Sequence, residues 1–237
     1  MKIQVLFGSA NDERVYGPLC RSLEKCGDVK MEVASAHRDP QKVHEIVTTC
    51  KADVFVAGAG LAAHLPGVVA SLTEKPVFGV AVNGAFAGLD SFLSIVQMPR
   101  GVPVMAVTEE NAGTIGDYIL RMARVPQYRI CLHWNRSLES YSPIQKALDE
   151  IQVQTQLKVE WTAANDNNCI GEIVSPWELP RTQGLNLFLC EKEQLASSNL
   201  ALDFFGKARH GGFWVGANNV TNYVAQWKKM MILGAAK

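Results

Sequence analysis

The sequence predicts an α/β protein whose first half forms a doubly wound parallel sheet. In that half, short runs rich in β-branched and aromatic residues alternate with segments whose apolar residues recur every three or four positions. Such alternation is typical of parallel strands joined by crossover helices. The chain has 237 residues, of which 48% are hydrophobic, so it can bury one large core or two small ones.

The elements of the first half are expected in a definite order along the chain. Strands are expected at residues 3–7, 30–34, 54–57, 77–82 and 102–107. Apolar residues from Val15 to Leu23 recur at helical spacing, so a helix is expected from about residue 12 to residue 26, ending at Gly27. Asp39 and Pro40 have the N-cap and first-turn chemistry of a second helix. The resulting architecture is flavodoxin-like.

Composition and charge exclude several classes of protein. The chain carries 23 basic and 23 acidic residues, and each half is close to neutral, so neither offers a basic face to nucleic acid. The cysteines are widely scattered, with no C-x-x-C spacing, which favours buried thiols over a zinc site or a disulfide framework. They are Cys20, Cys26, Cys50, Cys131, Cys169 and Cys190. No metal site is expected.

Two features favour a cytoplasmic protein. Met1 and Lys2 run straight into the first strand, which leaves no room for a signal peptide. Residues 54–73 carry no formally charged side chain, but glycines, a histidine and a proline interrupt them. A strand, a loop and a buried helix therefore explain their composition better than a membrane span.

The second half repeats the order of apolar runs in the first, which predicts a tandem duplication with domains at residues 1–124 and 125–237. The matched positions are 130–132 on 5–7, 158–161 on 30–33, Phe188 on Phe55, Ala196 on Ala63, Gly212 on Gly79 and Val215 on Val82. Because identities are sparse, the preserved order of the runs carries the inference. The alternative is an unrelated α/β partner domain.

The second copy is expected to be degenerate and catalytically silent. In this match Gly8-Ser9 becomes His133-Trp134, Gly58 and Gly60 become Glu191 and Glu193, and His64 becomes Ser197. All five tryptophans lie in this half, where large side chains fill former pocket space or anchor an interface.

The run Gly8-Ser9-Ala10-Asn11-Asp12 follows the first strand and opens the first helix. Glycine lets the backbone approach a ligand closely, while a serine hydroxyl and the N–H groups of a helix N-terminus can hold an anion. A purely structural alternative is that Asp12 caps the helix and Gly8 only turns the chain.

Histidines follow the second and third expected strands. Ser35 and Arg38 flank His37, and Arg38 can make a bidentate contact to a phosphate group. His64 lies in the run Ala62-Ala63-His64-Leu65-Pro66-Gly67, a small and dry environment at the same sheet edge. The structural alternatives are a solvated Arg38, a His37 bonded to backbone and a His64 satisfied in the core. The other histidines, His44, His133 and His210, are interpreted as structural or exposed.

Taken together, these motifs make the first half resemble the class I 5-(carboxyamino)imidazole ribonucleotide mutases of de novo purine synthesis. The matching blocks are Gly8-Ser9 with Asp12, Ser35-Ala36-His37-Arg38 with Pro40, Gly58-Ala59-Gly60 with Ala62 to Gly67, Asp90-Ser91, and Ser94 to Pro99 with Gly101-Val102-Pro103. Several independent blocks in the right order make the resemblance specific.

The resemblance implies a reaction that needs no metal and no organic cofactor. A carboxylate moves from the exocyclic amine of an aminoimidazole ribonucleotide to ring carbon C4, through release and recapture of carbon dioxide. The implied catalytic residues are His37, as proton shuttle, and His64, beside the carbon dioxide. The implied substrate-binding residues are Gly8, Ser9, Asn11, Asp12, Ser35, Arg38, Gly58, Ala59, Gly60 and Leu65, with Ser9, Ser35 and Arg38 around the phosphate and Asp12 on the ribose.

The chain departs from the family pattern at several positions. Asn11 stands where a second serine is usual, Asp39 replaces a threonine, and Leu61 replaces a glycine. Asn11 can still donate a hydrogen bond, so phosphate binding is expected to survive. The stretch from Thr108 to Ala112 is shorter and more acidic than the Gly/Ala-rich loop expected there.

Two other functions remain open at this stage. The related aminoimidazole ribonucleotide carboxylases use free carbon dioxide, but Arg38 and His64 favour the mutase. A non-catalytic ribonucleotide-binding scaffold is disfavoured because His37, Arg38 and His64 are all retained. Members of the resembled family assemble as octamers that share sites between neighbours, so a fused silent copy predicts a homo-oligomer, a tetramer acting as a pseudo-octamer.

Overall fold

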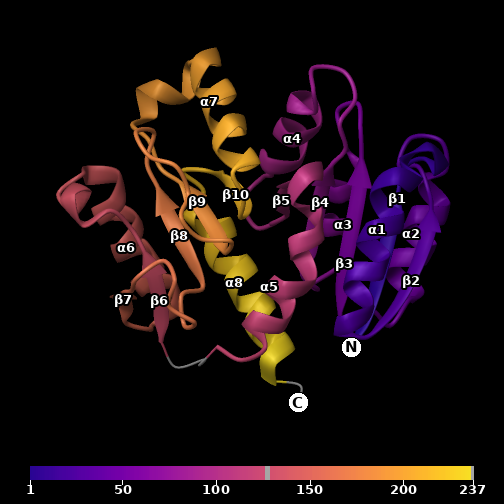
Figure 1. The fold of residues 1–237 in the computed structure, drawn as a ribbon, viewed down its shortest axis with the longest axis horizontal. Coiled ribbons are helices and arrows are strands. Elements are labelled where there is room, and N and C mark those ends of the chain that lie inside the picture. The colour runs from indigo at the N-terminus through magenta and orange to yellow at the C-terminus, as the bar shows by residue number, and fades with distance from the viewer. Residues whose placement is uncertain (126–128, 236–237) are drawn as a thin grey trace.

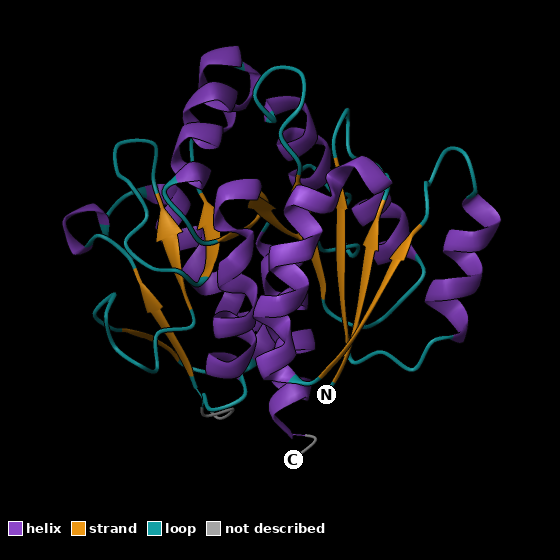
Figure 2. Ribbon diagram, turned by 45° about the vertical axis from the view of Figure 1, so that its right-hand side comes forward, coloured by secondary structure: helices purple, strands orange, loops and turns teal. Residues whose placement is uncertain are grey.

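A single twisted sheet runs through the computed structural model, which describes residues 1–125 and 129–235 (Figure 1). Within that range the strand order is β2-β1-β3-β4-β5-β10-β9-β8-β6-β7. Helices cover both faces of the sheet (Figure 2). The expected second domain, residues 125–237, includes residues 126–128 and 236–237, which lie outside the described residues.

The strands and helices have the following bounds. The strands are β1 (Lys2–Phe7), β2 (Asp28–Val33), β3 (Val54–Ala59), β4 (Val77–Ala81), β5 (Met105–Thr108), β6 (Ile130–His133), β7 (Val159–Trp161), β8 (Gly171–Val174), β9 (Leu185–Phe188) and β10 (Phe213–Ala217). The α-helices are α1 (Glu13–Leu23), α2 (Pro40–Thr49), α3 (Leu65–Ser71), α4 (Leu89–Val96), α5 (Ile115–Met122), α6 (Ser142–Thr155), α7 (Ser198–Arg209) and α8 (Val220–Ala235). Short 3₁₀ turns are η1 (Ala10–Asp12), η2 (Glu24–Cys26), η3 (Glu109–Thr114), η4 (Arg136–Leu138) and η5 (Lys192–Ala196).

The first half confirms the predicted doubly wound parallel sheet. Its strands pair in the order β2-β1-β3-β4-β5, and every pair is parallel. The first helical segment runs from η1 through η2 and ends at Gly27, whose φ of +150° suits glycine. The Asp39 carboxylate caps α2 by accepting the backbone N–H of Lys42 at 3.2 Å, and Pro40 occupies the first turn.

The fifth strand begins later than expected. β5 starts at Met105 rather than at residue 102, because Val102 donates its N–H to the Pro99 carbonyl in a turn and Pro103 has no N–H to give to a ladder. Residues 54–73 form β3, a loop and the largely buried helix α3, as expected. None of the helices within the described ranges is both long and apolar enough to span a membrane.

The second half has the same strand order as the first, read as β7-β6-β8-β9-β10, and its pairs are parallel. The sequence match is wrong from residue 188 onward, so the matches of Ala196 and Gly212 fail, and Glu191, Glu193 and Ser197 are not the counterparts of Gly58, Gly60 and His64. Phe188 lies in the fourth strand of its half, so it corresponds to β4 and not to Phe55 of β3. Val215 likewise lies in β10, the fifth strand, and not at the end of a fourth strand. The shift arises because the third strand, β8, was not recognised in the sequence.

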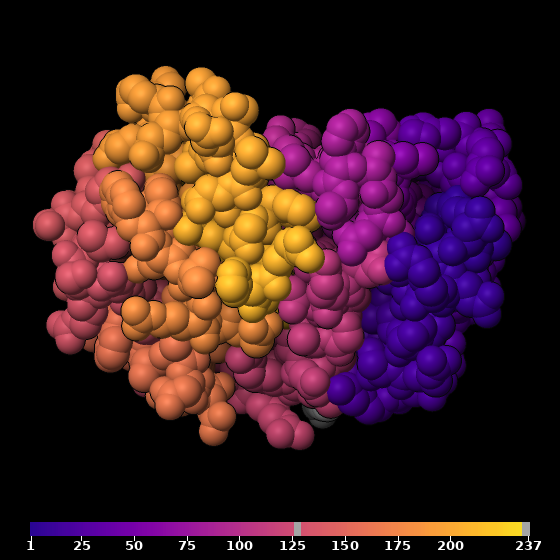
Figure 3. All heavy atoms as spheres, turned by 45° about the horizontal axis from the view of Figure 1, so that its top comes forward, coloured from indigo at the N-terminus to yellow at the C-terminus, as the bar shows by residue number. Residues whose placement is uncertain are grey.

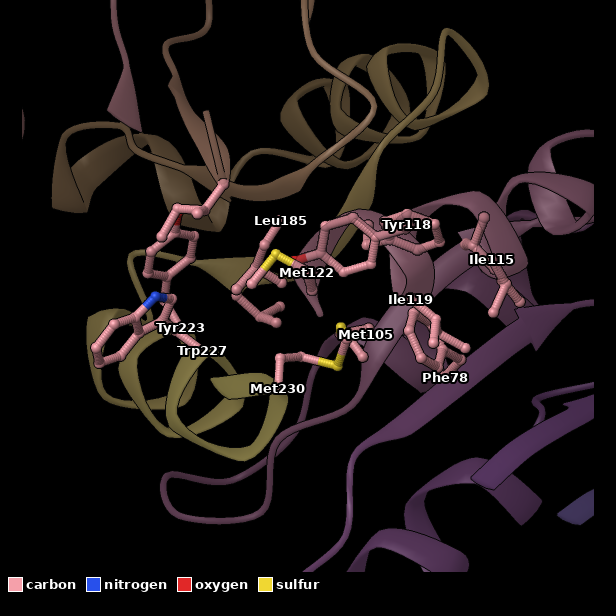
Figure 4. Close-up of a cluster of buried hydrophobic side chains, with 14 of the residues drawn as sticks. Phe78, Met105, Ile115, Tyr118, Ile119, Met122, Leu185, Tyr223, Trp227 and Met230 are labelled. Atoms are coloured by element: carbon pink, nitrogen blue, oxygen red, sulfur yellow. The ribbon is translucent and has the colours of Figure 1, made fainter. Parts of the chain in front are cut away.

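The two halves join where β5 pairs with β10 in antiparallel orientation, with Ala106 opposite Trp214. Helices α5 and α8 cross beside this junction, and their side chains fill a shared core (Figure 4). There the Tyr118 ring lies 4.7 Å from the Phe213 ring and 6.2 Å from the Phe78 ring, measured between centroids. On the face drawn in Figure 3, the yellow C-terminal surface borders the magenta part of the first half and not its indigo beginning.

Gly58 shows how tightly the centre of the first half is packed. A Cβ atom built on Gly58 would overlap the aromatic ring of Phe7 on the neighbouring strand β1. Both residues are in the sheet interior, where the backbone of β3 is held by neighbours on both sides. The Phe7 ring therefore occupies the space that a side chain at position 58 would need.

Replacing this glycine tests the packing. Gly58→Ala is expected to lower the free energy of unfolding by about 1–3 kcal/mol, because the new methyl group overpacks the core. Gly113→Ala is the matched control, since a Cβ there meets no atom within 4 Å, and its effect should stay within about 0.5 kcal/mol. Denaturant unfolding of both variants gives the comparison. Equal stability of the two variants would refute the packing role of Gly58.

Candidate active site

A cleft of about 470 Å³ lies at the carboxyl ends of β1, β2, β3 and β4, the edge where parallel sheets bind ligands. Almost all residues predicted for the site line it: Gly8, Ser9, Asn11, Asp12, Ser35, His37, Arg38, Ala59, Gly60, His64 and Leu65. Gly58 is the exception. It is buried in β3, where its carbonyl accepts the N–H of Gly8 at 3.0 Å and an added Cβ would overlap the Phe7 ring. Gly58 is therefore a packing residue of the sheet.

The loop after β1 forms one wall. The Ser9 hydroxyl accepts the backbone N–H of Asn11 at 3.2 Å and caps η1. Asp12 precedes α1 but makes no capping hydrogen bond with its side chain, so the structural alternative for this carboxylate is wrong. Burial raises the pKa of Asp12; the charge of Arg14 opposes that shift, and the charge of Glu109 adds to it. The Asp12 carboxylate is thus left available to a ligand.

The loop after β2 folds over the first loop. Arg38 donates from Nη2 to the carbonyl oxygen of Gly8 at 3.1 Å, and its backbone N–H donates to the Ser35 hydroxyl at 3.3 Å. These contacts bring the guanidinium to the mouth of the cleft beside Ser9. A guanidinium has five N–H donors. The hydrogen bond to Gly8 uses one of them, so most donors of Arg38 remain available to an anion.

Two imidazole rings meet at the surface of the cleft. Both residues are exposed, so the dry environment expected for His64 is wrong, and so is the alternative of a core histidine. His37 Nε2 lies 2.7 Å from His64 Nδ1, and the ring planes are nearly perpendicular, at 82°. Because a hydrogen bond needs one donor and one acceptor, one of these nitrogens carries a proton and the other accepts it. His37 follows β2, whereas His64 precedes the first turn of α3. The fold therefore brings together two histidines that are 27 positions apart, within hydrogen-bond distance of each other.

The loop between β3 and α3 is held in a strained conformation. Leu61 and Ala62 have φ values of +50° and +51°, in the left-handed region that L-residues with a Cβ adopt at some cost. The Asp90 carboxylate accepts the backbone N–H of Ala62 at 3.1 Å, and the neighbouring Ser91 hydroxyl donates to the Val82 carbonyl at 3.2 Å. Asp90 and Ser91 therefore hold two segments of the cleft wall, at Ala62 and at Val82, by hydrogen bonds.

A fourth wall, Val82-Asn83-Gly84, was not predicted from the sequence. The acidic stretch from Thr108 to Ala112, expected as a shortened loop, ends β5 and enters the turn η3. There the Glu109 carboxylate accepts the backbone N–H of Asn83 at 2.7 Å and pairs with Arg14. The sequence did offer one signal for this wall: Asn83 is a polar residue directly after the fourth expected strand, at the same sheet edge as the other loops.

In the second half, buried polar side chains occupy β6 and β8, and a smaller cleft of about 220 Å³ follows β9 and β10. His133, at the end of β6, is buried and contacts the carbonyl oxygen of Thr162 at 3.0 Å through Nδ1. Glu172 of β8 is also buried and accepts the backbone N–H groups of Arg181 and Thr182. Burial raises the pKa of the Glu172 carboxyl, and these two N–H groups oppose the shift. Backbone groups thus satisfy both side chains, whereas the indole N–H of Trp134 and the hydroxyl of Ser175, directly after β6 and β8, are buried without a partner. Across residues 1–125 and 129–235, no cluster of three or more His, Cys, Asp or Glu residues could hold a metal ion.

Comparison with known proteins assigns the first half to a family. The family model described as AIR carboxylase matches residues 2–137. The chain belongs to the AIR carboxylase family. The N5-carboxyaminoimidazole ribonucleotide mutase of Methanocaldococcus jannaschii is 49% identical over 124 residues, which are 51% of this chain and 79% of that protein. The mutase of Pyrococcus abyssi is 47% identical over 116 residues, 47% of this chain and 67% of that protein.

A third relative carries a different name. The phosphoribosylaminoimidazole carboxylase of Candida glabrata is 42% identical over 132 residues, 53% of this chain and 23% of that protein. The motifs that suggested the resemblance, and the whole cleft, lie inside the stretch matched by the AIR carboxylase family.

Proposed function

We propose that this chain is a 5-(carboxyamino)imidazole ribonucleotide mutase of de novo purine synthesis. It moves a carboxylate from the exocyclic amine to ring carbon C4 of aminoimidazole ribonucleotide, giving 4-carboxy-5-aminoimidazole ribonucleotide. One observation carries the mechanism: a hydrogen-bonded pair of histidines at the surface of a cleft, in a chain of the AIR carboxylase family whose relatives include named mutases.

The cleft walls suggest how the ribonucleotide is oriented. The phosphate group meets Ser9, Ser35 and the guanidinium of Arg38, because hydroxyls and a guanidinium donate strong hydrogen bonds to phosphate oxygens. The Asp12 carboxylate accepts hydrogen bonds from the ribose hydroxyls. In this orientation the imidazole ring of the substrate extends toward His37. The remaining contacts come from Gly8, Asn11, Ala59, Gly60 and Leu65, and the glycines and the alanine let the backbone approach the ligand closely.

The reaction then needs one proton delivered and one proton removed. A proton given to the exocyclic nitrogen allows the bond between that nitrogen and the carboxyl carbon to break, which releases carbon dioxide and leaves the neutral aminoimidazole. The electron-rich C4 attacks the carbon dioxide, a carbon–carbon bond forms, and C4 loses its hydrogen as a proton. Protons and carboxyl groups balance without an external reagent. His37 gives the first proton and takes the second.

His64 supports this exchange through its contact with His37. The hydrogen bond of 2.7 Å fixes the orientation of the His37 ring and lets a proton pass between the two imidazoles. His64 also lies beside the position that carbon dioxide occupies between its release and its recapture. Recapture is faster than escape only if the site holds the gas next to C4.

Two alternatives are separated by one assay. A direct carboxylase takes carbon dioxide from solution, as the name of the Candida glabrata relative allows, and a scaffold binds the ribonucleotide without turnover. The assay measures conversion of the carbamate ribonucleotide, and separately of aminoimidazole ribonucleotide, each with and without added bicarbonate. The mutase converts it at the same rate in both conditions. A direct carboxylase acts on aminoimidazole ribonucleotide and needs bicarbonate, and a scaffold converts neither substrate.

The shuttle role of His37 predicts the effect of His37→Asn. This variant is expected to abolish turnover while the dissociation constant of the ribonucleotide changes by less than about tenfold, because asparagine keeps hydrogen bonding but cannot shuttle a proton. The control is His44→Asn, which changes an exposed histidine on α2 outside the cleft. Turnover and calorimetric titration of both variants give the answer. Near-normal turnover by His37→Asn would refute the assignment.

The phosphate site predicts the effect of Arg38→Ala. Loss of a charge-assisted contact worth about 1.5–3 kcal/mol should weaken binding of aminoimidazole ribonucleotide about 10- to 150-fold. Arg100→Ala is the matched control, because Arg100 is exposed and does not line the cleft. If Arg38→Ala binds as tightly as the unchanged chain, the phosphate group occupies another place.

We also propose that residues 125–237 are a degenerate, non-catalytic repeat. The common strand order and the burial of His133 and Glu172, both hydrogen-bonded to backbone groups, support this interpretation. A silent copy fused to each catalytic copy would occupy alternate positions of a closed assembly, a tetramer of chains acting as a pseudo-octamer. We place the enzyme in the cytoplasm, where free thiols are stable, since all six cysteines are free.

The repeat proposal predicts both the mass of the assembly and its ligand stoichiometry. Light scattering should give a mass near four chains, and titration with aminoimidazole ribonucleotide should saturate at one ligand per chain. An active monomer would contradict the tetramer. Two ligands per chain would contradict the silent second half.

A further inference from the structure

Three consecutive residues connect the cleft to the second half. Asn111 donates from Nδ2 to the carbonyl oxygens of Ala208 and Arg209, at 3.3 and 3.1 Å, and so satisfies the C-terminal end of α7. Glu110 accepts a hydrogen bond from Arg209 Nη2 at 3.2 Å. The segment Glu109-Glu110-Asn111 is therefore fastened to the last turn of α7.

The same segment holds Asn83 in the wall of the cleft. Glu109 accepts the backbone N–H of Asn83 at 2.7 Å, and Glu110 Oε1 accepts its side-chain Nδ2 at 3.2 Å. The carbonyl oxygen of Asn83 accepts Arg14 Nη2 at 3.0 Å. One oxygen of Glu110 thus receives both the Asn83 carboxamide and the Arg209 guanidinium.

We infer that Arg209 is a positioning residue for the cleft: through Glu110 it fixes the carboxamide of Asn83 in the orientation that binds the ribonucleotide. This inference rests on the proposed function for the identity of the ligand. It assigns the second half a role in substrate binding, although that half contributes no residue to the cleft lining.

The solvent exposure of the Arg209–Glu110 ion pair decides which measured quantity its loss should change. The side chains of Arg209 and Glu110 are 52% and 39% exposed, and exposed ion pairs add little to folding stability. Arg209 and Thr108 together hold the Glu110 carboxylate that accepts the Asn83 carboxamide. Loss of Arg209 should therefore change the affinity for substrate more than it changes the chemical step or the melting temperature.

The test compares four variants of the full chain: Arg209→Ala, Arg209→Lys, Glu110→Gln and the double variant Arg209→Ala with Glu110→Gln. Arg136→Ala is the matched control, because it removes the same charge from the same half and its guanidinium lies over the Trp161 ring, away from the cleft. Each protein is assayed for kcat, KM and melting temperature. Binding of aminoimidazole ribonucleotide is titrated separately at low and high ionic strength.

Arg209→Ala is expected to raise KM and the dissociation constant about two- to fivefold, the range that an exposed ion pair supports, with kcat and the melting temperature nearly unchanged. Arg209→Lys should restore much of the affinity. The double variant should bind no more weakly than the weaker single variant, because both changes break one chain of contacts. High salt should shrink the difference between Arg209→Ala and the unchanged chain.

Several outcomes would overturn the inference. An unchanged KM in Arg209→Ala, an equal loss in Arg136→Ala, or additive losses in the double variant would each show that Arg209 does not act through Glu110. The titration also separates this test from the proposed function. A chain that binds the ribonucleotide but does not convert the carbamate refutes the mutase and leaves the positioning role measurable.

Discussion

The antiparallel pairing of β5 with β10 is the contact on which the rest of the molecule depends. A parallel sheet leaves an unpaired edge strand that must be covered, and here each half covers the edge of the other, with Trp214 opposite Ala106. Trp214 is fully buried and donates its indole N–H to the carbonyl oxygen of Gly211 at 3.0 Å. The aromatic core between α5 and α8 closes over the same junction. The second half is thus part of one folded core.

Near this junction, residues of the second half form hydrogen bonds with the segments before and after β5. Before β5, Asn222 of α8 accepts the N–H of Gly101 at 2.8 Å and donates to the carbonyl oxygen of Pro99 at 3.0 Å. After β5, Asn111 holds the end of α7, and its neighbours hold Asn83 in the cleft. These contacts give the second half a structural role around the cleft, and the proposal of a non-catalytic repeat needs no other role for it.

Local patterns made most of the first half predictable from sequence. Helix ends at Gly27 and Asp39 depend on neighbouring residues alone. The carboxyl ends of parallel strands meet at one edge, which pointed to the place of the cleft, and the family resemblance supplied most of its individual residues. The strand β8 was missed because it is only four residues long and contains the ionisable Glu172, whose burial depends on distant backbone N–H groups. The sequence could not predict the contact between His37 and His64 or the hydrogen bond from Asn83 to Glu110. Each joins residues that only the folded chain brings together.

The central claim is that a single cleft per chain, built by the first half and held by the second, binds the ribonucleotide. The most direct measurement is a crystal structure of the full chain with aminoimidazole ribonucleotide bound. The account predicts one ligand per chain, with its phosphate beside Ser9, Ser35 and Arg38 and its imidazole ring beside His37. A ligand at the strand ends of the second half, or a phosphate group facing the histidine pair, would contradict it.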